Sequence, residues 1–270
     1  MRSNRKLLIL VIASCTLLIS PIKVQEYQFP QNTWTSITLN SNHQIILPLL
    51  ESDLNGDGSL ENLIQNGDQI RIETNGSIAW QSPQDWRVKQ ALISDINWDG
   101  DLEVILLVSR PYQPWPVDRW LPYGGRISSF QDTSGYSSHI ILIGWTQGEY
   151  KEVWAGSGMS QPALEIGAAD VNQDGKIELV TLEGSYTDTS YSKGNAIKLW
   201  SWNGFGFSLL HEIPGNFSYF QIIQSTNTNK KTLIGIYFKE EAYENIFETA
   251  YLGGNLYRPF DQPGLQFSRV

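Results

Sequence analysis

The sequence predicts an all-β fold, a β-propeller built from four-stranded blades, and three observations lead to this prediction. Aromatic residues make up 12% of the 270 residues, with 10 Trp and 12 Tyr, and such side chains suit half-buried pleated surfaces. One acidic loop recurs three times between short apolar stretches. A hairpin-like segment follows each copy, so that each repeat supplies the strands of one blade. Four such units are visible along the chain, which favours four or five blades.

The recurring loop reads D-x-N-x-D-G-x-x-E, and its copies begin at Asp53, Asp95 and Asp170. Apolar residues precede and follow each copy, which is typical of loops that join two strands. The interval between the second and third copies is the longest, so it holds either one blade with an insertion or two blades with one unrecognised. A fourth segment, residues 222–236, aligns by its apolar flanks but has Gln224 in the first position and lacks the carboxylates. We therefore expect a fourth loop that has kept its shape and lost its metal.

Hairpin patterns complete the repeat. Residues 69–81, 139–154 and 196–213 each read as an apolar strand, a turn containing Gly or Asn, and a second strand. Residues 244–260 follow the degenerate loop in the same way. An additional strand at residues 37–39 precedes the first loop, and we expect it to pair with the last blade and close the ring.

The loop pattern predicts three calcium sites. Calcium takes six to eight oxygen ligands at about 2.3–2.6 Å, and the side chains at positions 1, 3 and 5 of a tight loop can converge on one ion. Position 7 would add its backbone carbonyl and position 9 a carboxylate, while Gly at position 6 permits the sharp turn. We expect moderate calcium affinities, on the order of 10⁻⁵–10⁻³ M, similar to those of extracellular modules. The expected ligands are Asp53, Asn55, Asp57, Ser59 and Glu61; Asp95, Asn97, Asp99, Asp101 and Glu103; and Asp170, Asn172, Asp174, Lys176 and Glu178.

The loop pattern has two other interpretations, an EF-hand and an ordinary turn. An EF-hand needs a Glu at position 12 and a helix after its loop, but position 12 is Ile64, Leu106 or Thr181, and the following residues favour strands. Alternatively, the copies are ordinary Asp/Asn/Gly turns with solvated acids, since these residues favour turns in general. Against this, each copy places three acids within nine residues, where they repel one another unless a cation is bound.

With Val104 and Leu179 at position 10 of the second and third copies, the D-x-N-x-D-G-x-x-E loop resembles that of the FG-GAP/VCBS repeat, which occurs in the propellers of integrin α-subunits and in many bacterial surface proteins. The resemblance covers residues 40–240. It implies a propeller with calcium held at loop positions 1, 3, 5, 7 and 9. Integrin-type propellers have seven blades, for which this chain is short.

The first 20 residues predict an export signal. Basic residues at the start are followed by an apolar run over residues 7–14, which is short for a membrane span. Residues 12–15, Ile-Ala-Ser-Cys, resemble a bacterial lipobox, in which Cys15 would carry the lipid. A simple cleaved signal or a short anchor is the alternative. Residues 26–270 would form the propeller of an exported protein, either a cell-envelope lipoprotein or a secreted protein.

Residues 110–137 interrupt the repeat with four Pro and several aromatic residues. Aromatic and Arg side chains in loops are frequent binding anchors, so this insertion is a candidate contact for a sugar or a peptide. Alternatively, its aromatic residues fold back over the propeller. The candidate contact residues are Tyr112, Trp115, Arg119, Trp120 and Tyr123.

The net charge, the scattered histidines and the missing hydrolase motifs indicate a binding protein more than an enzyme. The net charge of −9 argues against a nucleic-acid partner. His43, His139 and His211 are scattered, and the sequence lacks the motifs of a serine, cysteine or zinc hydrolase. We expect a non-catalytic calcium-stabilised binding or structural scaffold whose partner is a protein or a carbohydrate, with membrane contact only through the N-terminus. A propeller-fold polysaccharide hydrolase or lyase is the alternative.

Overall fold

The computed structural model describes residues 23–28, 33–38, 43–45, 50–113, 130–188, 193–225 and 231–237, and all regular secondary structure in these ranges is β-strand. The expected signal at residues 1–20, Cys15 and the expected hairpin at 244–260 lie outside the described residues. The prediction of an all-β fold is confirmed. Within these ranges no helix is long and apolar enough to cross a membrane.

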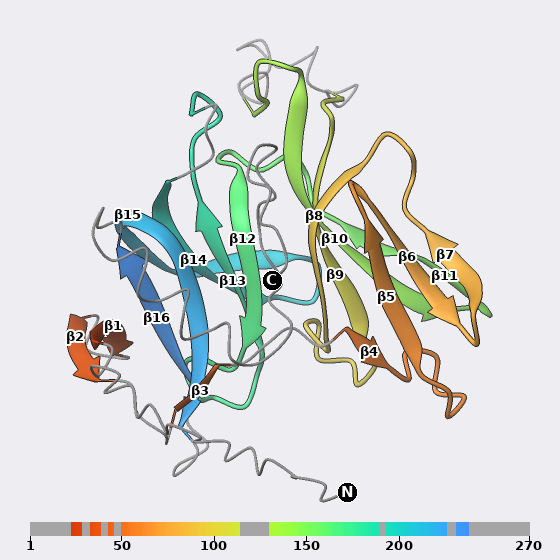
Figure 1. The fold of residues 1–270 in the computed structure, drawn as a ribbon, viewed down its shortest axis with the longest axis horizontal. Helices are drawn as coiled ribbons and strands as arrows, with labels where there is room; N and C mark the ends of the chain where they lie inside the picture. The colour runs from red at the N-terminus through yellow and green to blue at the C-terminus, as the bar shows by residue number, and fades with distance from the viewer. Residues whose placement is uncertain are drawn as a thin grey trace, which may run out of the picture.

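Two of the sheets are four-stranded antiparallel meanders in which each strand pairs with the next along the chain (Figure 1). The first sheet consists of β4 (Glu51–Ser52), β5 (Glu61–Asn66), β6 (Gln69–Thr74) and β7 (Ser77–Gln81). The second sheet consists of β8 (Arg87–Ser94), β9 (Glu103–Pro111), β10 (Tyr136–Thr146) and β11 (Glu149–Ala155).

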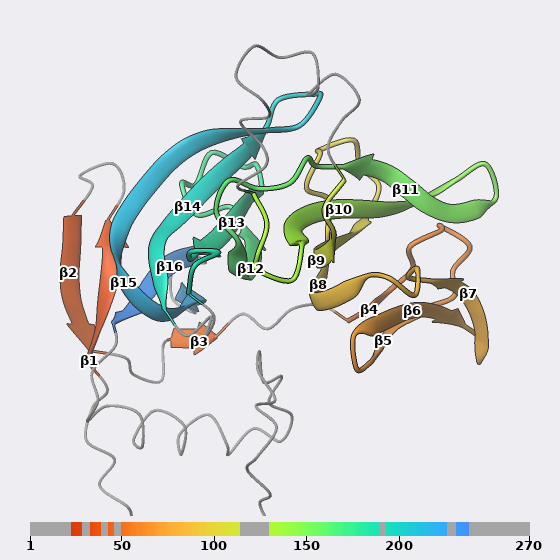
Figure 2. The ribbon, with the colours of Figure 1, turned by 90° about the horizontal axis from the view of Figure 1, so that it is seen from above.

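The third sheet is larger and curls strongly, because one long strand belongs to two meanders. This strand, β15, pairs with β14 as far as Phe217 and with β16 from Phe217 onward. Figure 2 shows the resulting bend of β15. In order, the sheet contains β12 (Ala163–Ala169), β13 (Glu178–Glu183), β14 (Gly194–Trp202), β15 (Phe207–Ser225), β16 (Lys231–Tyr237), β1 (Lys23–Gln28) and β2 (Thr33–Thr38), and β3 (His43–Ile45) pairs with the end of β15.

The hairpins form where the sequence predicts them. Asn75 and Gly76 have φ values of 51° and 76°, and two successive positive φ values match the twist of the flanking strands β6 and β7. Gln147 and Gly148 repeat this arrangement between β10 and β11, with φ values of 56° and 85°. The third expected hairpin, residues 196–213, lies within β14 and β15.

The sheets pack face to face, with the second sheet between the other two. In β9 every residue from Glu103 to Ser109 is buried, which explains its continuous apolar run. Leu106 and Val108 belong to a core shared with Ile72 of the first sheet. Ile105 and Leu107, on the opposite face, belong to a core shared with the third sheet.

Strands that occupy the same position in the order of their sheets lie beside one another in neighbouring sheets. The first strands, β8 and β12, are in contact, and so are the last strands of the first two sheets, β7 and β11. The Gln90 side chain on β8 hydrogen-bonds to both backbone groups of Ile166 on β12: its amide donates to the carbonyl at 2.9 Å and its oxygen accepts from the N–H at 2.8 Å. This pair of hydrogen bonds joins the first strands of the two sheets.

Among the described residues, the long interval between the second and third loops contains the strands β9, β10 and β11 of one sheet, with a long β9–β10 connection, as expected for one repeat with an insertion. The insertion is shorter than expected, because residues 110–111 and 136–137 are paired strand residues at its base. Ile37 and Thr38 lie in β2, which joins the C-terminal sheet through β1 and β16. The segment therefore joins the last sheet, but its own strand partner is β1 and not β16, and Leu39 lies outside the described residues.

Candidate metal-binding loops

Each acidic loop connects the first and second strands of a sheet. The three loops join β4 to β5, β8 to β9 and β12 to β13. We call them the first, second and third loop. Since a strand follows each loop, the EF-hand interpretation is wrong, and the strand–loop–strand prediction is confirmed.

The three loops share one backbone conformation. Position 6 is left-handed in each, with φ values of 87° at Gly58, 96° at Gly100 and 88° at Gly175. Position 4 is also left-handed, and in two loops it is not Gly: φ is 62° at Trp98 and 66° at Gln173. A non-Gly residue in this region costs about 1–2 kcal/mol, so the surrounding loop imposes this conformation.

A repeated hydrogen-bond network turns the polar side chains inward. The Asp at position 1 accepts from the N–H of position 6, the Asn at position 3 from that of position 5, and the Asp at position 5 from that of position 7. In the first loop these distances are 3.0, 2.8 and 2.7 Å. The second and third loops repeat all three bonds at 2.9–3.2 Å.

The Glu at position 9 forms the buried floor of each loop. Glu61, Glu103 and Glu178 are at most 3% exposed. One oxygen of each accepts a hydrogen bond from the backbone N–H of position 2, at 2.7, 3.3 and 2.9 Å respectively. Burial of these three carboxylates within a shared geometry argues against the alternative of ordinary turns with solvated acids.

Sequence reasoning missed the residues that anchor the loops. Position 2 is Leu54, Ile96 or Val171, and each is buried in one of the hydrophobic cores. Their backbone N–H groups hold the Glu at position 9, so each loop is attached to its core at the point where its carboxylate is fixed. An apolar residue at position 2 of every copy was the available signal.

The carboxylates converge in the third loop. Asp170, Asp174 and Glu178 each offer an oxygen, and these oxygens all lie within 4.8 Å of one another. The backbone carbonyl of Lys176, at position 7, belongs to the same turn.

In the first two loops the Asn amide bridges the acids. Asn55 Nδ2 donates to Asp57 at 3.2 Å and to Glu61 at 3.1 Å. Asn97 Nδ2 donates to Asp99 and Glu103 at 2.9 and 2.7 Å. The predicted side chains at positions 3, 5 and 9 therefore face a common point.

Burial and mutual repulsion set the electrostatics of the loops. Desolvation, reinforced by Asp99 and Asp95, raises the pKa of Glu103 to about 8. Desolvation likewise raises the pKa of Glu178 to about 7. In contrast, the hydrogen bond from the Ser59 backbone N–H lowers the pKa of the exposed Asp57 carboxyl. Asp95 Oδ1 is buried and accepts no hydrogen bond, although a cation would satisfy it.

The donor set fits a hard divalent cation. The converging carboxylates are hard oxygen donors, which calcium prefers. The Asn at position 3 now turns Nδ2 toward the acids, and a flip of its amide would offer Oδ1 instead. An orphaned carboxylate oxygen and raised Glu pKa values mark uncompensated negative charge, which a cation would neutralise.

The other expected contact residues lie apart from these loops. Tyr112 is partly buried at the base of the β9–β10 connection, where its N–H donates to the Gly135 carbonyl at 2.8 Å. Trp115, Arg119, Trp120 and Tyr123 lie outside the described residues.

Two of the three histidines, His139 and His211, contact residues that belong to the fold and not to the acidic loops. His139 is buried on β10, where it hydrogen-bonds to Ser137 Oγ at 2.6 Å and to the Gly156 carbonyl at 2.9 Å. Burial lowers its pKa to about 4, so its ring is neutral at pH 7. His211 is hydrogen-bonded to the Tyr27 hydroxyl.

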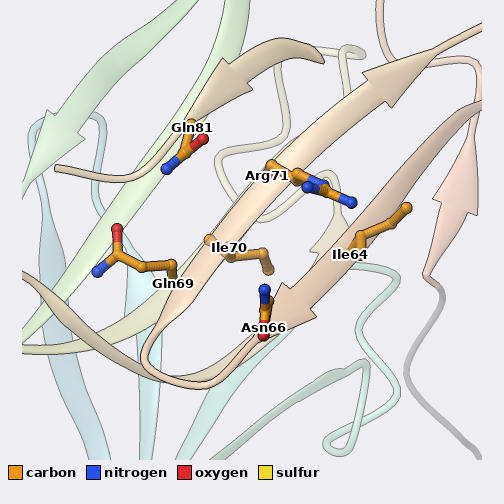
Figure 3. Close-up of a pocket in the computed structure, with 6 residues that line it drawn as sticks. All are labelled: Ile64, Asn66, Gln69, Ile70, Arg71 and Gln81. Carbon is orange, nitrogen blue, oxygen red and sulfur yellow. The ribbon is translucent and has the colours of Figure 1, made fainter. Parts of the chain in front are cut away.

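A small pocket lies on the first sheet, away from the acidic loops (Figure 3). Its volume of about 140 Å³ is well below the roughly 300–1,000 Å³ of typical small-molecule sites. The acidic loops are therefore the stronger candidate site. The pocket is lined by Ile64, Asn66, Gln69, Ile70, Arg71 and Gln81.

No protein-family model matches the chain, and no curated protein shows significant similarity to it.

Proposed function

We propose that this chain is an exported, calcium-stabilised β-propeller of the FG-GAP/VCBS type that acts as a non-catalytic binding or structural scaffold. The observation that carries the proposal is the threefold recurrence of one loop geometry, with the same two left-handed positions and the same inward hydrogen bonds. Identical strain retained at Trp98 and Gln173 is costly unless the loop shape is needed.

Calcium is the ion that best accounts for the loops. Each has three carboxylates, one Asn and a carbonyl available, which suits the six to eight oxygens that calcium takes. Magnesium requires a stricter octahedron and usually keeps several waters, so we propose that it binds more weakly. A bound ion would link the first and second strands of each sheet and stabilise the fold, because only the folded loop brings its oxygens together.

The strand arrangement supports four propeller blades. The second half of β15 precedes the degenerate loop just as β8 precedes the second loop, so it would be the first strand of a fourth blade. β12 lies against it: a Cβ built on Gly167 would come within 3.0 Å of Phe220 and Ile222. β8, β12 and the second half of β15 would thus be successive inner strands. β16, β1 and β2 would complete the fourth blade and hold the N-terminal segment against the last sheet.

The loops that connect the strands of a rigid scaffold are available to bind a partner. We propose that the β9–β10 connection contacts a protein or carbohydrate ligand, and that residues 1–20 direct export, with Cys15 as the lipid-bearing residue.

The test is calcium titration by calorimetry together with thermal unfolding in calcium and in EDTA. The wild-type chain should bind three calcium ions, and at 100 times Kd each site should add about 2.7 kcal/mol to the free energy of unfolding. The control is the triple variant Asp53→Asn/Asp95→Asn/Asp170→Asn, which keeps the side-chain shape and should lose both effects. Absence of calcium uptake by the wild type, with the same melting temperature in EDTA, would refute the proposal.

A further inference from the structure

Tyr150 belongs to the second sheet but faces the first loop. It lies on β11, is 6% exposed, and packs in the core that contains Leu54, the position 2 anchor of the first loop. The Trp145 ring lies against it with 4.8 Å between ring centroids. The phenol is thus held rigidly between the two sheets.

The hydroxyl of Tyr150 is buried and has no hydrogen-bond partner within ordinary geometry. Buried phenol groups normally have one. The acids close enough to interact with the hydroxyl are those of the first loop, and the interaction with Glu61 is stronger than those with Asp57 and Asp53. A tyrosine hydroxyl carries its proton at neutral pH and can therefore donate a hydrogen bond to this cluster.

Glu61 is already held by donors from its own sheet. Its Oε2 accepts from the Leu54 N–H at 2.7 Å, and its Oε1 accepts from Asn55 Nδ2 and Thr74 Oγ1, both at 3.1 Å. Tyr150 would add a donor from the neighbouring sheet. In the other two loops, the hydrogen bonds to Glu103 and Glu178 come from residues of the same loop.

We propose that Tyr150 is a positioning residue for the first cation site: its hydroxyl donates to the Glu61 carboxylate and fixes that ligand from the neighbouring sheet. This inference rests on the proposed calcium function. Its consequence is that a cation in the first loop adds a link between the first and second sheets beyond their shared core, whereas a ligand held only by its own loop would add none.

The test isolates individual loops in the full chain. The Asp95→Asn/Asp170→Asn background keeps only the first loop, and the Asp53→Asn/Asp95→Asn background keeps only the third. Tyr150→Phe retains the ring and removes only the hydroxyl. In calcium calorimetry this substitution should lower the calcium affinity of the first loop about tenfold, as expected when a residue that hydrogen-bonds to a metal ligand is lost. The calcium affinity of the third loop should not change. The melting temperature in EDTA should change little.

The outcomes separate the two proposals. If both backgrounds bind calcium and Tyr150→Phe does not change the calcium affinity of the first loop, the role of Tyr150 is refuted and the calcium function stands. An equal loss of affinity in both backgrounds indicates a general structural defect and also refutes the role. If neither background binds calcium before the Tyr150 change, the proposed function itself fails.

Discussion

The indole N–H of Trp98 in the second loop donates a hydrogen bond to the backbone carbonyl of Ile177 in the third loop, at 3.1 Å. The Lys176 ammonium group lies over the same indole ring, 4.3 Å from its centroid. Two acidic loops in different sheets are therefore in direct contact, at positions 7 and 8 of the third loop.

Trp98 and Gln173 form a matched pair for testing this contact. Both occupy position 4 with a left-handed backbone, so Gly relieves the same strain at either site. Gln173→Gly should leave stability unchanged or raise it by up to about 1 kcal/mol. Trp98→Gly should lower it by about 1–3 kcal/mol, because the interloop hydrogen bond and ring contacts are lost. Denaturant unfolding measures both changes, and equal effects at the two sites would contradict a role for the Trp98 contact.

Gly175 tests the conformational requirement at position 6. Its φ is 88°, and a Cβ there would meet no atom within 4 Å, so any cost of substitution is conformational. Gly175→Ala should reduce stability by about 1–2 kcal/mol and weaken calcium binding by the third loop. Gly175→Asn is the control, since Asn tolerates the left-handed region better, and it should be milder in both measurements. Indistinguishable Ala and Asn variants would contradict this explanation.

The pH dependence should reverse when calcium is added. Without calcium, the folded chain holds a proton on Glu103 up to about pH 8, whereas an ordinary Glu loses it near 4.5, so this group's contribution to stability falls as the pH rises between these values. Calcium binding requires the deprotonated carboxylate, so the affinity of the second loop should rise by one to two orders of magnitude from pH 6 to pH 8.

Calorimetry across this pH range, in buffers of different ionisation enthalpy, measures the affinity and the proton release together. Glu178, whose pKa is about 7, should give the same trend in the third loop at a lower pH. A calcium affinity that stays constant from pH 6 to pH 8 would contradict the assignment of these carboxylates as ligands.

His139 should make the fold sensitive to acid. Its pKa is lowered from 6.5 to about 4 by burial, so protons bind the unfolded chain more readily than the folded one. The neutral ring makes its full contribution to the free energy of unfolding above pH 6.5. This contribution, up to about 3 kcal/mol, is lost as the pH falls toward 4. Thermal unfolding from pH 7 to pH 4 measures this loss. His139→Asn serves as the control, because the difference in slope between it and the wild type isolates the histidine from the acids.

The sequence was most informative about local features. The three copies of the loop located the turns between first and second strands, and Gly at position 6 indicated the left-handed backbone that Gly58, Gly100 and Gly175 adopt. Asn75–Gly76 and Gln147–Gly148 marked hairpins, because their conformational preferences depend on adjacent residues only. These features follow from the backbone preferences of a few neighbouring residues.

Contacts between sheets were beyond sequence reasoning. Nothing in the pattern indicated that Tyr150 shares a core with Leu54, that Trp98 reaches Ile177, or that β15 pairs within two meanders, since each depends on residues far apart in the chain. The sequence by itself determined the strands, their hairpins and the inward-facing acids of each loop, because side-chain period and turn chemistry are local. Only the tertiary structure decided which loops touch and which carboxylates lose solvent, because burial and its electrostatic consequences arise when whole sheets pack together.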